Sequence, residues 1–236
     1  MSPMRRSTCG GCRLEVNGTT VVARASGALW IAAERTLAAG DLHFEKGSAY
    51  GARGGQLLPP YDTMATLDRL EAEVAALRPE RIVLMGDTLH DRWAEDRLAA
   101  DAVSRIAALG DGRIIVWLAG NHDPKPPRGL PGEVAGDLAI EGLLLTHEPH
   151  AGPAAGEVAG HLHPVATVAG YGARVRRRCF LTDGRRMILP AFGAYAGGLN
   201  VTDRTFAGLF EAPPTALILG EEAVHAVAWA KLTAGR

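Results

Sequence analysis

The chain of 236 residues has few of the features that mark secreted or membrane proteins. Its three cysteines are too few for a disulfide framework. It has no run of about 18 consecutive apolar residues that could span a membrane, and the basic residues in 1–13 are not followed by the apolar stretch of a signal peptide. We therefore expect a cytoplasmic protein with no membrane partner.

Neither sign of charge is in excess. The 25 basic and 26 acidic residues give a formal net charge of -1, which excludes attraction of the whole molecule to nucleic acid. Any nucleic-acid partner must be held by a local patch, and the dense basic run comprises Arg174, Arg176, Arg177 and Arg178, followed by Arg185 and Arg186. Two interpretations stay open for this run, namely a solvated strand face and a surface that contacts DNA phosphates.

Residues 1–13 contain little that could be buried, so we expect a flexible N-terminal segment before a single domain over 14–236. Cys9 and Cys12 form a Cys-x-x-Cys pair, but no second pair completes a zinc site. We interpret them as free thiols. Cys179 precedes Phe180 and is expected to face inward from a strand.

The hydrophobic pattern predicts an α/β protein. Asn17-Gly18 between β-branched residues indicates a hairpin turn. Strands are expected at 29–31, 36–40, 82–85 and 114–118, and helices at 64–77 and about 94–109. The second half is rich in strands, with candidates at 165–175, 185–189, 199–201 and 216–227. We expect two facing sheets with helices outside, and loops at 44–60 and 124–136.

Polar side chains repeatedly follow an apolar strand. These strand-end motifs are Asp41-Leu42-His43, Gly86-Asp87, Gly120-Asn121-His122-Asp123, His147 and His161-Leu162-His163. Ligands gather at the carboxyl ends of parallel strands, so we expect the motifs to converge on one site.

The motifs supply seven candidate metal ligands: Asp41, His43, Asp87, Asn121, His147, His161 and His163. Seven are too many for one tetrahedral zinc, whereas a bridging carboxylate would give four bonds to each of two metals. Carboxylate, imidazole and amide ligands without thiolate favour divalent Mn, Fe or Zn. The excess positive charge of two such ions favours an anionic phosphate ester as substrate.

A two-metal site of this kind predicts attack on phosphorus by a hydroxide that bridges the metals. His122 directly follows the candidate ligand Asn121 and is the candidate general acid for the leaving oxygen. Asp123 could orient the His122 imidazole. The competing interpretation of His122 is a surface loop histidine.

In this order, the motifs resemble those of the calcineurin-like metallophosphoesterase superfamily. The flanks at 39–47, 58–63, 146–149, 160–164, 178–180 and 189–198 resemble the bacterial ligase-associated DNA damage response endonuclease family. The resemblance implies a four-layer α/β/β/α sandwich with two facing mixed sheets. It also implies two metal ions, most often Mn, with DNA as substrate and a DNA-repair ligase or helicase as partner.

The resemblance assigns a role to each motif. It implies that Asp41, His43, Asp87 and His163 hold the first metal and that Asp87, Asn121, His147 and His161 hold the second. His122 becomes the leaving-group acid.

Several points stay open. His90 either touches substrate or packs beside the site, and the role of Lys46 is undecided. The same ligand set also suits a phosphatase or a small-nucleotide phosphodiesterase, because specificity resides in the loops. A non-catalytic scaffold for DNA-repair partners is a third alternative, which the complete ligand set disfavours. The oligomeric state is not predicted.

Overall fold

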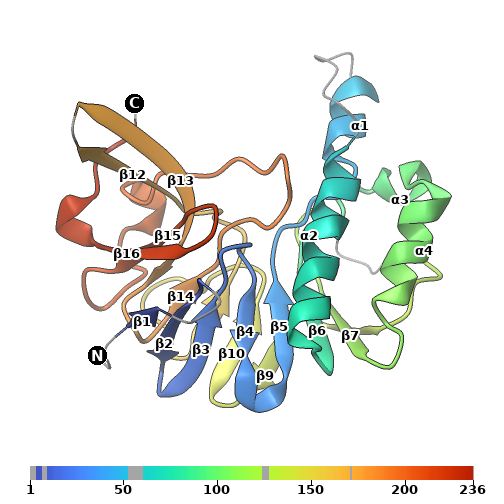
Figure 1. The fold of residues 1–236 in the computed structure, drawn as a ribbon, viewed down its shortest axis with the longest axis horizontal. Helices are drawn as coiled ribbons and strands as arrows, with labels where there is room; N and C mark the ends of the chain where they lie inside the picture. Colours follow the sequence, from blue (N-terminus) through green and yellow to red (C-terminus); the bar gives the residue numbers. More distant parts are fainter. Residues whose placement is uncertain (1–3, 7–9, 53–60, 124–127, 171, 236) are drawn as a thin grey trace.

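The computed structural model describes residues 4–6, 10–52, 61–123, 128–170 and 172–235. Two mixed sheets face each other (Figure 1). The first has the order β1 (Arg5–Arg6), β2 (Cys12–Val16), β3 (Thr19–Ala23), β4 (Leu29–Ile31), β5 (Thr36–Ala39), β6 (Arg81–Met85), β7 (Ile114–Leu118) and β8 (Glu133–Ala135). Strands β5 to β8 are parallel, and the pairs from β1 to β5 are antiparallel.

The second sheet has β10, β11 and β14 as its parallel centre. Its order is β16 (Val224–Ala228), β15 (Thr215–Leu219), β13 (Ala173–Thr182), β14 (Met187–Ile188), β11 (Glu157–Ala159), β10 (Leu143–Thr146) and β9 (Leu138–Ile140). Strand β12 (Val165–Gly170) lies off this path and pairs with β13 as an antiparallel hairpin.

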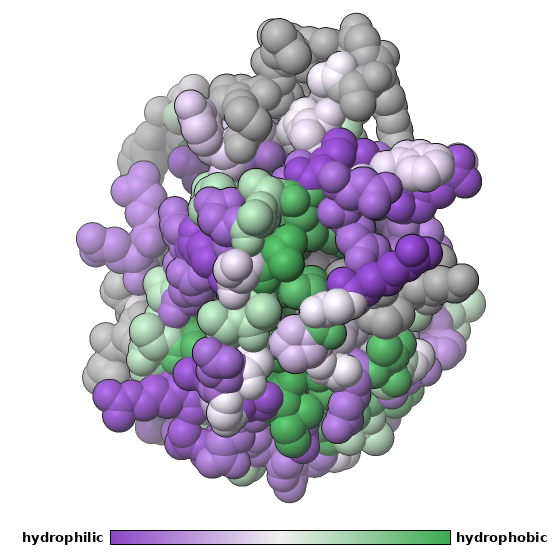
Figure 2. All heavy atoms as spheres, turned by 90° about the vertical axis from the view of Figure 1, so that its right-hand side faces the viewer, coloured by the Kyte–Doolittle hydropathy of each residue, from purple (hydrophilic) through white to green (hydrophobic). Residues whose placement is uncertain are grey.

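The α-helices are α1 (Lys46–Ala52), α2 (Asp62–Leu77), α3 (Ala94–Arg97) and α4 (Ala100–Ala108). In the described part of the chain there are also three short 3-10 helices, η1 (Ala32–Glu34), η2 (Arg204–Phe206) and η3 (Trp229–Lys231). The α-helices follow the strands of the first sheet along the chain and lie on its side of the molecule (Figure 1). Figure 2 shows this side, on which hydrophilic residues surround smaller hydrophobic areas.

Alternation along β6 explains the layers. Val83 and Met85 face the second sheet and pack in a cluster with Val158 and Phe180. The intervening Ile82 and Leu84 face the helices and pack in a second cluster. The predicted α/β class with two facing mixed sheets is therefore confirmed. On the outer face of the second sheet, the described residues form a third hydrophobic cluster around Phe206 and Leu209. The layer that was expected to be helical on this side contains short 3-10 helices in the described part of the chain.

Most expected elements form, and Asn17 and Gly18 make the expected hairpin turn with positive φ angles of 49° and 84°. The helix expected at 94–109 is divided into α3 and α4, because the chain leaves helical geometry at Leu98, with φ -58° and ψ 126°. The side chain of Leu98 packs against the helix-side cluster.

Two expected loops contain regular structure. The prediction of a loop at 44–60 is wrong over Lys46–Ala52, which forms α1. A hydrogen bond from the Gly47 amide to Asp62 Oδ2 at 2.9 Å holds the start of this helix. Residues 53–60 lie outside the described part. The prediction of a loop at 124–136 is wrong over Glu133–Ala135, which forms β8 and pairs with β7 as a parallel edge strand. Residues 124–127 lie outside the described part.

Residues 4–6 and 10–13 of the segment expected to be flexible contain regular structure. Arg5–Arg6 pairs with Cys12 and Arg13, and Cys12 is buried at the start of β2, where alternate residues enter the core. The Gly10 carbonyl also accepts a hydrogen bond from the Val224 amide at 2.9 Å. Residues 1–3 and 7–9, including Cys9, lie outside the described part. Cys179 is fully buried, as expected.

Candidate metal centre

The five strand-end motifs meet at the carboxyl ends of the parallel strands, and backbone hydrogen bonds join their turns. The Asp41 amide donates to the Gly86 carbonyl at 3.2 Å, and the His43 amide donates to the Asp87 carbonyl at 2.9 Å. The His161 amide donates to Asp41 Oδ2 at 3.0 Å, although 120 residues separate the two. The predicted convergence of the motifs is therefore observed.

The backbone at this point is unusual. Positive φ angles of 46° to 65° occur at five of the candidate ligands, Asp41, His43, Asp87, His161 and His163. Left-handed geometry is costly for residues other than glycine and persists only where the surroundings enforce it. Such a concentration is typical of a functional site.

Six of the seven candidate ligands form two groups that could each hold a metal ion. Asp41, His43 and His163 form one group, and Asp87, His147 and His161 form the other. Within each group the ligand atoms lie within 4.8 Å of one another. The groups are adjacent, since His147 Nδ1 is 3.9 Å from Asp41 Oδ1.

The donor atoms of these groups fit divalent cations. His147 is buried, and its Nε2 has no hydrogen-bond partner among the described residues but lies 3.4 Å from Asp87 Oδ1. Its Nδ1 is 3.0 Å from the Met85 carbonyl, a contact that holds a ligating imidazole in one orientation. A buried nitrogen without a hydrogen-bond partner, beside a carboxylate, is the environment that a bound cation would satisfy.

His43 and His163 give the same indication in the first group. Their Nε2 atoms face each other at 3.4 Å. Burial, followed by the nearby charges of His163 and Lys46, lowers the pKa of His43 to about 2, so this imidazole is neutral near pH 7. Neutral imidazole is the form that ligates metals.

The turn after β7 carries the remaining motif. Asn121 and His122 are exposed, and Gly120 packs so closely that a Cβ there would lie 2.1 Å from the Asp87 nitrogen. The His122 amide donates to Asp87 Oδ1 at 2.9 Å, while its Nε2 lies 3.8 Å from Asp87 Oδ2. This turn therefore places Asn121 and His122 at the mouth of the second group.

The expected role of Asp123 in orienting His122 is replaced by a different one. Asp123 Oδ2 accepts hydrogen bonds from the Thr88 and Leu89 amides at 2.7 and 2.9 Å. Burial, assisted by the nearby charge of Asp87, raises the pKa of Asp123 to about 7. Asp123 thus ties the turn after β7 to the loop after β6.

The rings of Tyr50, His90 and His122 form a stack beside the site, and only the two histidines were singled out from sequence. His90 stacks on His122 with ring centroids 5.6 Å apart, and Tyr50 of α1 stacks on His90 at 6.4 Å. His43 meets the His90 and His122 rings edge-on. The role of Tyr50 could not be found from sequence, because the segment 44–60 gave no helical signal.

Arg178 holds a backbone segment that contacts the site. Its Nη1 donates to the carbonyls of Ala191, Phe192 and Gly193 at 2.8, 3.3 and 3.1 Å. The Gly193 amide in turn donates to the Asp41 carbonyl at 3.1 Å. Burial, followed by the charge of Arg69, lowers the pKa of Arg178 to about 10. From sequence, Arg178 was grouped with its exposed neighbours. In the structure its role is instead to hold the segment 191–193 in place.

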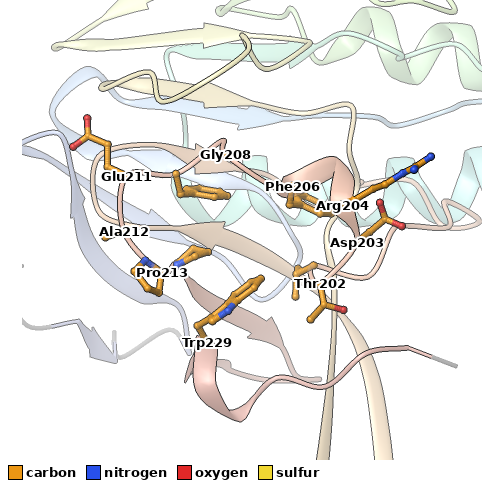
Figure 3. Close-up of a pocket in the computed structure, with 13 residues that line it drawn as sticks. Thr202, Asp203, Arg204, Phe206, Gly208, Glu211, Ala212, Pro213 and Trp229 are labelled. Carbon is orange, nitrogen blue, oxygen red and sulfur yellow. The ribbon is translucent and has the colours of Figure 1, made fainter.

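A separate cavity of about 400 Å³ lies beside η2 and η3 and contains none of the candidate ligands (Figure 3). Aromatic and proline side chains line it, among them Phe206, Pro213 and Trp229. Its carboxylates are already engaged: Asp203 accepts hydrogen bonds from Thr205, and Glu211 pairs with Arg185 at 3.1 Å. The groups with metal-binding geometry therefore lie at the strand ends and not in this cavity.

Comparisons with known proteins show which family and which solved structures this chain resembles. The model of the calcineurin-like phosphoesterase family matches residues 34–184. The crystal structure of the nuclease MPE of Pseudomonas putida is similar, with 28% identity and a TM-score of 0.71 over 92% of this chain and 100% of that chain. YfcE, a phosphoesterase from E. coli, has 17% identity and a TM-score of 0.40 over 82% of this chain and 98% of that chain. No curated protein sequence matches significantly. No helix in the described ranges is long and apolar enough to cross a membrane.

Proposed function

The chain belongs to the calcineurin-like phosphoesterase family, whose model matches residues 34–184, and we propose that it is a two-metal phosphodiesterase that cleaves DNA during repair. It is a hydrolase of phosphoester bonds with two groups of candidate metal ligands. The observation that carries the proposal is the pair of adjacent groups, Asp41, His43 and His163 beside Asp87, His147 and His161.

The residues of each group would hold one ion. Asn121 would join Asp87, His147 and His161 around the second ion, and Asp87 would be the carboxylate shared by both ions. The absence of thiolate from this set favours Mn, with Fe or Zn as alternatives. Bound divalent ions would supply an activated water and positive charge beside the phosphate.

His122 would supply the proton for the leaving oxygen. Its side chain is 48% exposed, so a substrate can reach it, while Asp87 Oδ2 lies 3.8 Å from its Nε2. The stacked His90 ring and the edge of His43 limit how the imidazole can turn. A proton on Nε2 would thus be directed toward the oxygen that leaves phosphorus.

The phosphodiester specificity is supported by similarity to a nuclease across most of both chains. A DNA-repair ligase or helicase as partner rests only on the resemblance of the sequence motifs. The intact ligand groups and the accessible His122 argue for catalysis against the scaffold alternative.

Metal analysis of the purified protein, followed by a comparison of turnover, tests the proposal. We expect two ions per chain, with Mn supporting the fastest cleavage of an aryl phosphodiester and of DNA. The matched control is the same preparation after chelation, with Mn added back. A preparation that binds fewer than two ions would contradict the two-metal site, and preference for a phosphomonoester would assign the chain to the phosphatases.

A further inference from the structure

The β12–β13 hairpin begins and ends at the metal centre. Strand β12 starts two residues after His163, and Val165 pairs with Arg178 across the hairpin. Farther out, Thr167 pairs with Arg176 and Ala169 pairs with Arg174. Figure 1 shows this hairpin and α1 projecting at the same end of the molecule on opposite sides. At about 3.4 Å per residue, Arg174 lies about 14 Å farther along the strand than Arg178.

Alternation along β13 divides its arginines between two faces. Arg174 and Arg176 share the face of Arg178, whereas Arg177 points the other way. Arg178 contacts the segment 191–193, and Arg176 Nη2 donates to the Gly198 carbonyl at 2.7 Å. Gly198 itself lies directly against the His163 carbonyl. The face of Arg174 and Arg176 is therefore the one that continues into the metal centre.

The charge on this face is not balanced by the protein. Arg174 and Arg176 are exposed, and no carboxylate of the described residues forms an ion pair with either. Their cross-strand neighbours Ala169 and Thr167 are uncharged, although opposite charges at such positions would stabilise a solvated sheet. Arg176 uses one N–H group on Gly198, which leaves further guanidinium donors directed to solvent.

We propose that Arg174 and Arg176 bind phosphates of a polynucleotide strand whose scissile phosphate lies in the metal centre. The inference rests on the proposed phosphodiesterase function and adds a substrate requirement to it. Guanidinium groups bind phosphate oxygens in bidentate geometry, and one strand of a duplex presents a phosphate about every 3.4 Å along its axis. Because Arg174 lies about 14 Å farther out than Arg178, a strand must extend at least about four nucleotides beyond the cleaved bond to reach Arg174.

The test compares kcat/KM for a DNA oligonucleotide of about twelve nucleotides with kcat/KM for an aryl phosphodiester, in salt from about 50 to 200 mM. In the Arg174→Gln/Arg176→Gln variant we expect the ratio of the two values to fall about tenfold at low salt. Two lost phosphate contacts should also reduce the slope of log kcat/KM against log salt for single-stranded DNA by about 1.4. Arg174→Gln alone, at the exposed far part of the strand, should give about half of this change in slope.

Arg177→Gln is the matched control, since it removes the same charge from the same strand on the opposite face. It should retain the wild-type ratio. The inference is overturned if the double variant keeps the wild-type ratio and slope, or if Arg177→Gln changes them as much. An RNA oligonucleotide of the same length shows whether the contact extends to both polynucleotides, since an equal loss with RNA supports recognition of the shared phosphates.

Failure of the two proposals is distinguishable. A wild-type protein that does not cleave the aryl phosphodiester with any divalent metal contradicts the proposed function. A wild-type protein that cleaves the ester but shows no gain with oligonucleotide length contradicts only the role of Arg174 and Arg176.

Discussion

Asp87 and His122 are joined through the backbone as well as through their side chains. The His122 amide donates a hydrogen bond to Asp87 Oδ1 at 2.9 Å, while the imidazole Nε2 lies 3.8 Å from Asp87 Oδ2. The carboxylate therefore fixes the turn that carries the proposed acid. Substitution of Asp87 should therefore disturb both metal binding and the turn that carries His122. Substitution of His122 removes only the imidazole, because a residue other than proline at this position retains the backbone amide.

For Asp87→Ala we expect loss of bound metal and turnover below about 1% of wild type, since the variant lacks the carboxylate that we propose is shared by the two ions. Added Mn should raise the Tm of the wild type by binding only the folded state, and should leave the Tm of the variant unchanged. Metal analysis and thermal unfolding measure both effects. Two ions per chain in the variant would contradict the assignment of Asp87.

The His122→Ala variant should keep both metals but cleave DNA about 10²- to 10⁴-fold more slowly, the range typical of a lost general acid. A nitrophenyl ester should lose much less, because nitrophenolate leaves without a proton. Comparison of the two substrates measures the effect. Equal losses with both would show that His122 acts by some means other than protonating the leaving group.

Gly120→Ala should weaken metal binding at the second group. A Cβ at this position would lie 2.1 Å from the Asp87 nitrogen and 2.5 Å from its Oδ1, so the turn or the carboxylate must move. Gly136→Ala is the matched control, because a Cβ there meets nothing within 4 Å. Metal titrations of the two variants should differ at least tenfold in affinity, the lower end of the range for displaced supporting groups. Similar affinities would mean that the turn adapts freely.

Arg186→Met should strongly destabilise the fold. Arg186 and Glu157 are 1% and 2% exposed, and Arg186 Nη2 lies 2.6 Å from Glu157 Oε1. The guanidinium also donates to the carbonyls of His150, Gly152 and Leu209, each at 2.7 Å. Removing one partner of a buried pair costs about 3–5 kcal/mol of unfolding free energy.

The adjacent Arg185→Met provides the control for that measurement. Arg185 pairs with Glu211 on the surface, where the two side chains are 56% and 44% exposed. An exposed ion pair contributes at most about 1 kcal/mol. Urea denaturation of the two variants should therefore separate them clearly, and equal midpoints would argue against a structural role for the buried pair.

The candidate metal ligands could be identified from sequence because their signal is local. Each one follows an apolar strand within a few residues, and in a parallel sheet such strand ends lie at one edge. Asn17-Gly18 was likewise predictable, since positive φ at two successive turn residues favours these residue types. In contrast, Asp123 accepts hydrogen bonds from Thr88 and Leu89, which are 35 and 34 residues away. No local pattern marks such a contact.

The basic run illustrates the same limit. Arg176, Arg178 and Arg186 look alike in the sequence, yet one is exposed, one holds the carbonyls of 191–193 and one is buried against Glu157. Composition could not separate them, because burial depends on what packs against each face of β13 and β14.

The sequence alone determined the chemistry of this protein: the order and type of the carboxylate, amide and imidazole groups at the strand ends. Only the tertiary structure decided which of these groups face one another, which rings stack on His122 and which arginines of β13 are exposed. The reason is physical. Strand ends and turns follow from the energetics of neighbouring residues, whereas the pairing and packing of sheets bring together residues more than a hundred positions apart, as His161 and Asp41 show.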